Sequence, residues 1–501
     1  MNYYLGFDAG TQSVKVGVYD EQMNCVSQAT KKTTLYYPEA GWVEMDAQEY
    51  LQLIKQCMRQ CSLQLQEQGI PVSSVRSIMG DGIICGIVGI DESGTAITPY
   101  INYLDSRTLA DVEELKKDCQ FPWGTVTGNG EPSCMFPAMH GRWFLKNSSV
   151  FQEKGVKFVH NAPYVLLNLA GLGAKDAFVD WGTMSGWGLG YNVYKKEWDH
   201  EQLDILGIDP SYMPRIVKPW DIIGTLSEAA AEETGFAVGT PICGGAGDTM
   251  QSMLGSGVLE AGRAVDVAGT CAMFCVSTDH IVPELSRPGA GLIFNSGTLP
   301  NTYFYWGFVR TGGLSLRWFK DSICRQASDD YYRTLSEGAA KVPTGSEGVF
   351  FIPYLTGGYG EYKGLKGSFM NMTLDTTQFT LWRSVLEAIG YEYLEITDRY
   401  RAGGIPIDRI TVTEGGSRDD VWNQIKADML DSEVVVPAVA GGAVPTNCIV
   451  GAYAVGDIDS LKNVLEQQLK LRCSYDPNKS NTAYYRRQYG LKKSLLQQMI
   501  K

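Results

Sequence analysis

Residues 3–19 read YYLGFDAGTQSVKVGVY. The first five of them form a short apolar run, and Val14 to Tyr19 alternates apolar and polar residues as a half-buried strand does. Between these two runs lies the polar, glycine-containing segment 8–13. The stretch therefore predicts a β-hairpin whose turn carries a carboxylate and several hydroxyl groups.

A second hairpin of similar design is predicted near the middle of the chain, at 264–276, AVDVAGTCAMFCV. Residues 264–268 are strand-like, Gly269 and Thr270 form the turn, and a returning strand follows at 273–276. Two such hairpins, about half a chain apart, indicate two domains built on one plan.

The length agrees with that interpretation. A chain of 501 residues exceeds the usual size of one domain, which is roughly 100–200 residues. We expect an N-terminal domain at 1–250, a C-terminal domain at 251–456, and a polar, helix-prone C-terminal appendage at 457–501.

Charge and composition exclude several classes of partner. The 43 lysines and arginines against 56 aspartates and glutamates give a net charge of −13, which argues against nucleic-acid binding and against anionic membranes. We expect no signal peptide, no membrane span and a cytoplasmic protein. The twelve cysteines form no CxxC pair, so they are interpreted as structural thiols. An anionic ligand such as ATP is still possible, because local amides and a metal can outweigh the global charge.

The turn of the first hairpin is a candidate phosphate site. A tight turn with glycine lets backbone amides converge on a phosphate, and Thr11, Gln12 and Ser13 add polar side chains. Asp8, at the end of a strand, could hold Mg²⁺, and Lys15 offers a compensating charge. The alternative is an ordinary hairpin turn, for which such residues are common.

A second candidate is the loop 243–248, CGGAGD, which leads into a predicted helix. Phosphoryl transfer to an alcohol needs a carboxylate that orients the hydroxyl and accepts its proton, and Asp248 is placed for that role. The alternative is that Asp248 caps the helix.

A third candidate is Gly415-Gly416, after a predicted strand at 410–413 and before a helix that Ser417 and Asp420 are expected to cap. Bare glycine backbone there could accept a flat adenine ring. The alternative is a loop that simply precedes a helix.

Taken in order, the motifs resemble the FGGY family of carbohydrate kinases, and the xylulokinase-like branch most. The resemblance spans about residues 3–456. It rests on FDAGTQSVK, GGAGD, DVAGT, GGLSLRWFKD (312–321), FIPYLTG (351–357) and TEGGSRDDVWNQIKADML (413–430), and on PYINYLDSR (99–107) and DWGTMSGWGLGYNVYKKEW (180–198) in the sugar-binding half.

The resemblance implies an α/β, two-domain actin-like (ribonuclease H-like) fold with ATP in an interdomain cleft. It implies that Asp248 is the catalytic base and that Asp8 serves Mg²⁺ and catalysis. The residues expected on the ATP side are Thr11, Gln12, Ser13, Lys15, Gly269, Thr270, Gly313, Arg317, Gly415, Gly416 and Asp420. Those expected on the substrate side are Ile84, Cys85, Asp105, Asp248 and Thr249.

The sequence departs from the family pattern at the sugar. Ile84-Cys85 stands where xylulokinases have a Met-His pair, Thr249 where many members have asparagine, and Gly358-Tyr359 where a glutamate and an arginine are usual. We therefore expect ATP-dependent phosphorylation of a small sugar, either a ketopentose such as D-xylulose or a related ketose, polyol or aldonate. A mechanical actin-like ATPase and a catalytically silent sugar sensor are the alternatives, and homodimerisation is left open.

Overall fold

The computed structural model describes residues 1–118, 121–152, 156–269, 272–309, 312–358, 362–438 and 442–500. The chain divides into two compact units. Unit 1 comprises Met1–Leu259, Asp279–Phe304 and Gly441–Leu469, and unit 2 comprises Glu260–Thr278, Tyr305–Ala440 and Lys470–Lys501.

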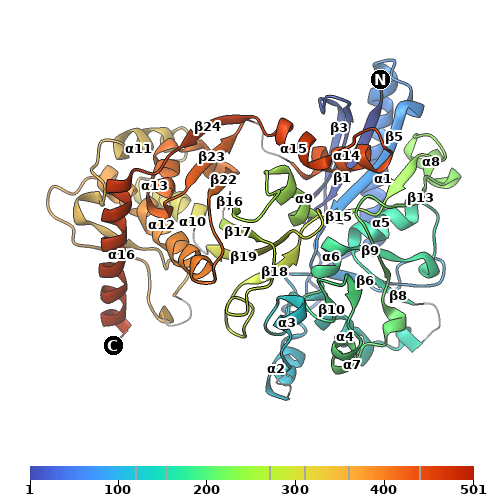
Figure 1. The fold of residues 1–501 in the computed structure, drawn as a ribbon, viewed down its shortest axis with the longest axis horizontal. Coiled ribbons are helices and arrows are strands. Elements are labelled where there is room, and N and C mark those ends of the chain that lie inside the picture. Colours follow the sequence, from blue (N-terminus) through green and yellow to red (C-terminus); the bar gives the residue numbers. More distant parts are fainter. Residues whose placement is uncertain are drawn as a thin grey trace. The chain divides into compact units, whose positions relative to one another are not determined.

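Unit 1 is built on a seven-stranded mixed sheet with the order β13-β14-β5-β1-β2-β3, in which β15 also pairs with β5 (Figure 1). Strands β1 (Tyr3–Ala9) and β2 (Ser13–Asp20) form the antiparallel hairpin predicted from the sequence. Strand β5 (Val75–Gly82) pairs with β1 in parallel, and β15 (Ala246–Gly247) pairs in parallel with β5. Three chain segments therefore end at the same edge of this sheet.

Helices α1 (Ala47–Glu67) and α14 (Ala443–Ala454) cover opposite faces of the sheet. Leu5 and Phe7 belong to the core that contains the buried side chains of α1, whereas Tyr4 packs against α14. Alternate residues of a strand point to opposite faces, so Gly6 also faces α14. A Cβ atom on Gly6 would lie 2.4 Å from the carbonyl oxygen of Val444, so only glycine allows this close packing.

The remaining strands of unit 1 are β3 Cys25–Lys32, β4 Glu44–Met45, β6 Gly86–Ile90, β7 Tyr100–Asn102, β8 Lys157–Val159, β9 Phe178–Asp180, β10 Tyr191–Asn192, β11 Glu197–Trp198, β12 Arg215–Val217, β13 Ile222–Thr225, β14 Pro241–Cys243 and β18 Ile293–Ser296. Its remaining helices are α2 Leu109–Asp118, α3 Gly124–Thr127, α4 Pro137–Asn147, α5 Asn161–Leu169, α6 Trp181–Ser185, α7 His200–Leu206, α8 Glu228–Thr234, α9 Asp248–Gly255 and α15 Leu461–Gln468.

Unit 2 repeats the plan of unit 1, with strands in the order β19-β17-β16-β22-β23-β24. Strands β16 (Arg263–Ala268) and β17 (Ala272–Thr278) form the second predicted hairpin, and β22 (Arg409–Thr413) runs parallel to β16. In both units an antiparallel hairpin is thus extended by parallel strands, as the paired sequence motifs predict.

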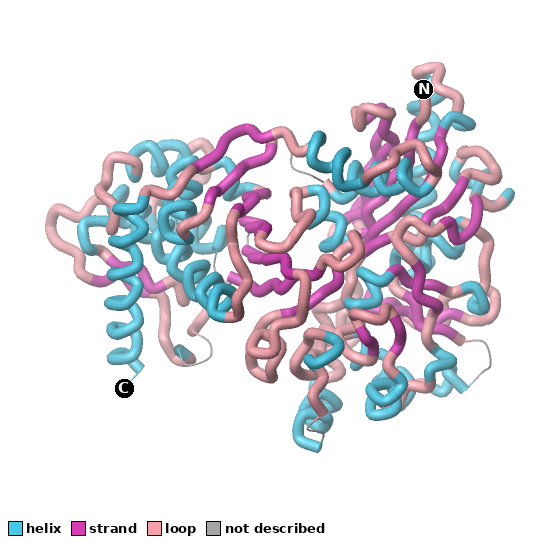
Figure 2. The backbone as a smooth tube through the Cα atoms, in the orientation of Figure 1, coloured by secondary structure: helices cyan, strands magenta, loops and turns pink. Residues whose placement is uncertain are grey.

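The segment after residue 456 is divided between the two units, although the sequence suggested one appendage. Helix α15 belongs to unit 1. In unit 2, strand β24 (Leu471–Tyr475) pairs with β23 (Glu433–Pro437), and α16 (Lys479–Ile500) packs against α13 (Asp420–Leu430) and ends the described chain (Figure 2). The other elements of unit 2 are β19 Tyr303–Val309, α10 Gly312–Trp318, α11 Tyr331–Ala339, β20 Phe350–Ile352, β21 Ser368–Met370 and α12 Gln378–Ala402.

The predicted capping box of α13 is wrong. Its N-cap is Asp419, whose side chain accepts a hydrogen bond from the Trp422 amide. The Ser417 hydroxyl donates instead to the Glu414 carbonyl within the preceding 3₁₀ turn, and Asp420 is the first helical residue. Ser417 and Asp419 both have side chains that favour the N-cap position, and the 3₁₀ turn at 415–418 leaves that position to Asp419.

Candidate functional site

Three carboxylates meet at one edge of the sheet in unit 1. Asp8 of β1 and Asp81 of β5 are direct neighbours in the parallel pairing of those strands. On the other side of β5, Gly247 pairs with Gly82, and Asp248 follows immediately as the first residue of α9. Parallel strands present their carboxyl ends at the same edge, so this topology gathers the three acids.

Burial raises the pKa of all three acids, and the charges of neighbouring acids add to the effect for Asp81 and Asp248. Burial is the largest cause for Asp81, whose pKa lies well above the usual value, and the charges of Asp8 and Asp248 raise it further. Burial also raises the pKa of Asp8, although Lys15 opposes the shift, with Nζ at 3.7 Å from the Asp8 carboxylate. Burial and the charges of the neighbouring acids thus both disfavour full ionisation of the group.

Asp248 combines a raised pKa with a free oxygen. Burial, and secondly the charge of Asp8, raise its pKa to about 7. Its Oδ1 accepts from the amide and the hydroxyl of Thr249, at 2.6 and 3.1 Å. Its Oδ2 has no hydrogen-bond partner in the described part of the chain, and the residue keeps some solvent exposure. A carboxylate in this state can accept a proton near neutral pH.

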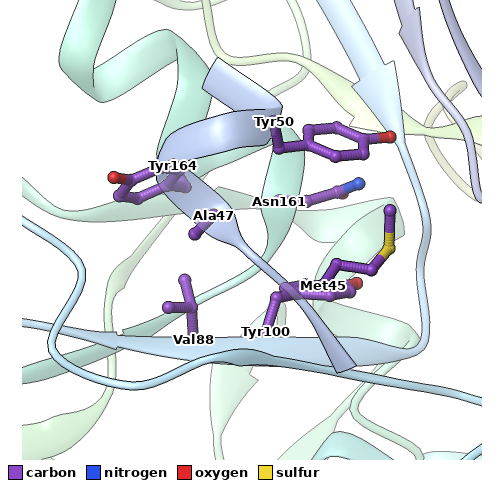
Figure 3. A pocket seen from close by; sticks show the side chains of 7 residues that line it. All are labelled: Met45, Ala47, Tyr50, Val88, Tyr100, Asn161 and Tyr164. Carbon is purple, nitrogen blue, oxygen red and sulfur yellow. The ribbon is translucent and has the colours of Figure 1, made fainter. Parts of the chain in front are cut away.

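The backbone carbonyl groups at the turn between β1 and β2 accept hydrogen bonds from other parts of unit 1. Asn161 Nδ2 donates to the Ala9 carbonyl at 2.9 Å, and the Tyr50 hydroxyl donates to the Gly10 carbonyl at 2.6 Å. Figure 3 shows the Tyr50 hydroxyl and the Asn161 amide pointing the same way, beside a cavity of about 10 Å³ that has room for about one water molecule.

Further along this turn, Thr33 binds the next two carbonyls. Its hydroxyl donates to the Thr11 carbonyl at 2.5 Å and its amide to the Gln12 carbonyl at 3.2 Å. The amides of Thr11 and Gln12 have no acceptor among the described residues. The turn therefore keeps its acceptors occupied and leaves donors for an anion, as a phosphate site requires.

Apolar and aromatic groups surround Asp248. Ile84 and Cys85 are both buried, and a Cβ atom on Gly247 would lie 2.2 Å from Cγ2 of Ile84. Burial, and in addition the charge of Asp248, raise the pKa of the Cys85 thiol and of the Tyr103 hydroxyl, so both groups lie near Asp248. The predicted substrate residues Ile84, Cys85, Asp248 and Thr249 thus come together, with Tyr103 beside them.

Asp105 has a different environment. Its Oδ2 accepts from the Val43 amide at 2.6 Å and from Arg107 Nη2 at 2.8 Å, and its Oδ1 accepts from the Arg107 amide and Nε at 2.8 and 3.0 Å. The Arg107 guanidinium also binds Glu44 and stacks on Trp42 at 3.8 Å. Both Asp105 oxygens are therefore engaged in a buried ion pair, which leaves them no free position for a substrate hydroxyl.

In unit 2, three of the predicted glycines gather at the end of β16. The Gly313 amide donates to the Gly269 carbonyl at 3.0 Å, and a Cβ atom on Gly416 would lie 2.5 Å from that of Ala268. Glu414, two residues before Gly416, has φ 62° and ψ −161°, a backbone conformation that residues other than glycine rarely adopt. Such strain is common at ligand sites. Thr270 and Tyr359 lie outside the described residues.

The other predicted ATP-side residues are spread around unit 2. Arg317 lines an open hollow of about 620 Å³ together with Lys320 and Tyr332. Asp420 Oδ1 accepts a hydrogen bond from the Tyr475 hydroxyl at 2.5 Å, and Gly415 has open space where a side chain would be. The open space at Gly415 agrees with a flat ligand there, whereas Gly416 is buried against Ala268 and Trp422.

Among the residues that the structure describes, no three His, Cys, Asp or Glu side chains are arranged so that they could hold a metal ion together. Asp8 nevertheless suits Mg²⁺, which is usually bound by one or two carboxylates plus phosphate oxygens and water. No described helix is long and apolar enough to cross a membrane, and the cysteines in the described ranges are free.

The sequence did not point us to Asp81, Tyr103 or Asn447. The side-chain amide of Asn447 donates to the Asp81 carboxylate. A signal for Asp81 was present, because an acid that ends a buried apolar strand, here after Ile78 and Met79, is exceptional. Asn447 is 366 residues from Asp81 and gives no local signal.

Comparison with known proteins gives one consistent family. Residues 3–255 match the N-terminal domain, and residues 264–455 the C-terminal domain, of the FGGY family of carbohydrate kinases. The gluconokinase of Bacillus subtilis (strain 168) is 27% identical over 477 residues, which cover 92% of this chain and 90% of that one. The xylulose kinase of the same organism is 22% identical over 498 residues, covering 99% and 97%.

Solved structures share the fold. The xylulose kinase of Rhodospirillum rubrum superposes with a TM-score of 0.89 at 23% identity, covering 99% of each chain. The gluconate kinase of Lactobacillus acidophilus gives 0.86 at 22% identity, covering 100% of this chain and 98% of that one. The predicted α/β, two-domain actin-like fold is thereby confirmed.

The raised pKa of Asp248 predicts how the free energy of unfolding changes with pH. Folded Asp248 holds its proton more tightly than the unfolded chain does, so this contribution to the free energy of unfolding is full below pH 3.8 and is lost as the pH rises through about 7. We expect the folded Asp248→Asn variant to lose less stability than the wild type between pH 5 and pH 8, as measured by thermal denaturation. Asp204→Asn, exposed on α7, is the control. Parallel curves for wild type and Asp248→Asn would contradict the shift.

Proposed function

The chain belongs to the FGGY family of carbohydrate kinases, and on that premise we propose that it transfers the γ-phosphoryl group of Mg²⁺-ATP to a hydroxyl of a small neutral sugar or polyol, with Asp248 as the general base. The observation that carries the proposal is the state of Asp248, which has a pKa of about 7 and an unpartnered Oδ2 beside the β1–β2 turn. An actin-like mechanical ATPase would have no use for such a group.

The base role follows from the chemistry of the acceptor. A sugar hydroxyl is a weak nucleophile until its proton has an acceptor, and a carboxylate within hydrogen-bond distance both orients it and takes the proton. Asp8 is less suited, because it interacts with Lys15 and Asp81 and adjoins the free amides of the turn. Thr249 fixes one oxygen of Asp248, which leaves the other to face the acceptor.

Mg²⁺ and the phosphates would be held by Asp8 and by the amides of Thr11 and Gln12. Bound there, the ion would neutralise charge that develops on the transferred phosphoryl group. The adenine end is proposed to lie beside Gly415 and Gly416, where Gly415 has open space in place of a side chain. Arg317, which lines an open hollow together with Lys320, is proposed to contact the nucleotide as well.

A neutral acceptor is supported by the charges around Asp248. The groups that shift its pKa include another acid, Asp8, and no lysine or arginine. A carboxylate-bearing acceptor such as gluconate would lack a cationic partner there. The relatives, whose names include gluconokinase, xylulose kinase and autoinducer-2 kinase, differ among themselves in acceptor.

Replacing the base tests the mechanism. Asp248→Asn keeps the shape of the side chain but accepts no proton, so we expect turnover to fall by about 10²–10⁴. ATP binding should persist, as measured by calorimetry, since Asp8 and the turn are unchanged. Asp204→Asn serves as the matched acid-to-amide control and should keep wild-type turnover. Near-normal turnover of folded Asp248→Asn would exclude it as the base.

The apolar pair Ile84-Cys85 leads to a prediction about the acceptor. A missing hydrogen bond to a sugar hydroxyl costs about 1–3 kcal/mol, or roughly ten- to a hundredfold in kcat/KM. In a coupled ADP-release assay with a panel of ketoses, polyols and D-gluconate, we expect D-xylulose to be turned over less well than another neutral acceptor.

The variant Ile84→Met/Cys85→His restores the pair usual in xylulokinases and should raise kcat/KM for D-xylulose while the KM for ATP is unchanged. D-Xylulose as the best wild-type substrate would contradict the prediction, and so would preference for D-gluconate. Turnover independent of any sugar would favour the ATPase alternative.

A further inference from the structure

A chain of buried side-chain hydrogen bonds connects the helix that carries Asp248 to the strands that carry the other two acids. Gln251 of α9 donates from Nε2 to Asn447 Oδ1 of α14 at 2.7 Å. The Asn447 amide donates in turn to the Phe7 carbonyl of β1, at 2.9 Å, and to the Asp81 carboxylate of β5. At the other end, the Thr298 hydroxyl donates to Gln251 Oε1 at 2.9 Å.

The side chains that form this series of hydrogen bonds are all shielded from water. Gln251, Asn447 and Asp81 have no exposed surface, and Thr298 is 2% exposed. Buried amides of this kind keep their positions because breaking one bond leaves a donor or acceptor unpaired. The connection is therefore a stiff one between α9 and the strand ends.

The start of α9 lacks a side-chain cap. Its N-cap is Gly247, which offers no side-chain hydrogen bond, and β15 before it is only two residues long. Gln251 follows Asp248 by three positions, which places the two side chains on the same face of the helix. A restraint at Gln251 therefore acts directly on the turn of helix that bears Asp248.

We propose that Gln251 and Asn447 are positioning residues that set where the Asp248 carboxylate stands relative to Asp8. This inference rests on the proposed role of Asp248 as the base. Asn447 bridges β1 and β5 and so takes its own position from the strands that carry Asp8 and Asp81. The hydrogen bond from Gln251 to Asn447 then fixes α9 relative to those strands.

The geometric requirement is strict. A proton acceptor must lie within hydrogen-bond distance of the hydroxyl that it activates, and a displacement of about 1 Å can cost about 10²-fold in rate. Loss of the Gln251 bond should therefore lower kcat and leave nucleotide binding unchanged, because the free amides of the β1–β2 turn do not depend on α9.

The first test is Gln251→Met, which keeps the side-chain volume and removes both hydrogen bonds. We expect kcat to fall about ten- to a hundredfold, with the KM for ATP within twofold of the wild type. The matched control is Gln202→Met on α7, since Gln202 is equally buried and its Oε1 accepts from the Gly190 amide at 2.9 Å. The control should lose thermal stability and keep its kcat.

A double-mutant cycle with Asp248→Asn separates a positioning role from a general loss of structure. If Gln251 acts through Asp248, Gln251→Met should lower single-turnover rates in the wild type and have no further effect in Asp248→Asn. Equal losses in both backgrounds, or an unchanged kcat in Gln251→Met, would overturn the inference. Wild-type turnover in Asp248→Asn would instead overturn the proposed base, whatever the Gln251 variant does.

Discussion

The parallel pairing of β5 with β1 on one side and β15 on the other is the constraint on which the site depends. It brings Asp8, Asp81 and Asp248 to one edge of a sheet, where their charges oppose one another and burial opposes all three. Such an arrangement disfavours full ionisation, so the protein must share protons within the group or supply donors to it. The described chain provides Lys15 beside Asp8, Asn447 as a donor to Asp81, and the amide and hydroxyl of Thr249 as donors to Asp248.

The two units show how one fold plan carries two kinds of chemistry. Both hairpins contain Ala-Gly-Thr at the turn, but the residue before it is Asp8 in unit 1 and Val267 in unit 2. The acid on β16 is Asp266, and Lys426 and the Tyr393 hydroxyl both bind it in the core of unit 2. Both oxygens of Asp266 are therefore engaged in unit 2, whereas Asp248 in unit 1 keeps one oxygen without a partner among the described residues.

Local sequence patterns predicted the parts of this account that local chemistry determines. The hairpin at 3–19 and the loop that ends at Asp248 were both readable, because apolar alternation and glycine turns act over a few residues. The cap of α13 was assigned wrongly, since Ser417 and Asp419 both suit the N-cap position. Asn447 and Gln251 could not be found, because their hydrogen bond joins residues 196 positions apart.

The pH dependence of kcat/KM for the acceptor, at saturating Mg²⁺-ATP, tests most directly whether Asp248 is the base. The account predicts that this ratio is constant above a midpoint at or below about 7 and falls about tenfold per pH unit beneath it, because only ionised Asp248 accepts the proton. A cation beside Asp8 would move the midpoint downward without removing the slope. A ratio that stays level from pH 8 down to pH 5 would contradict the account.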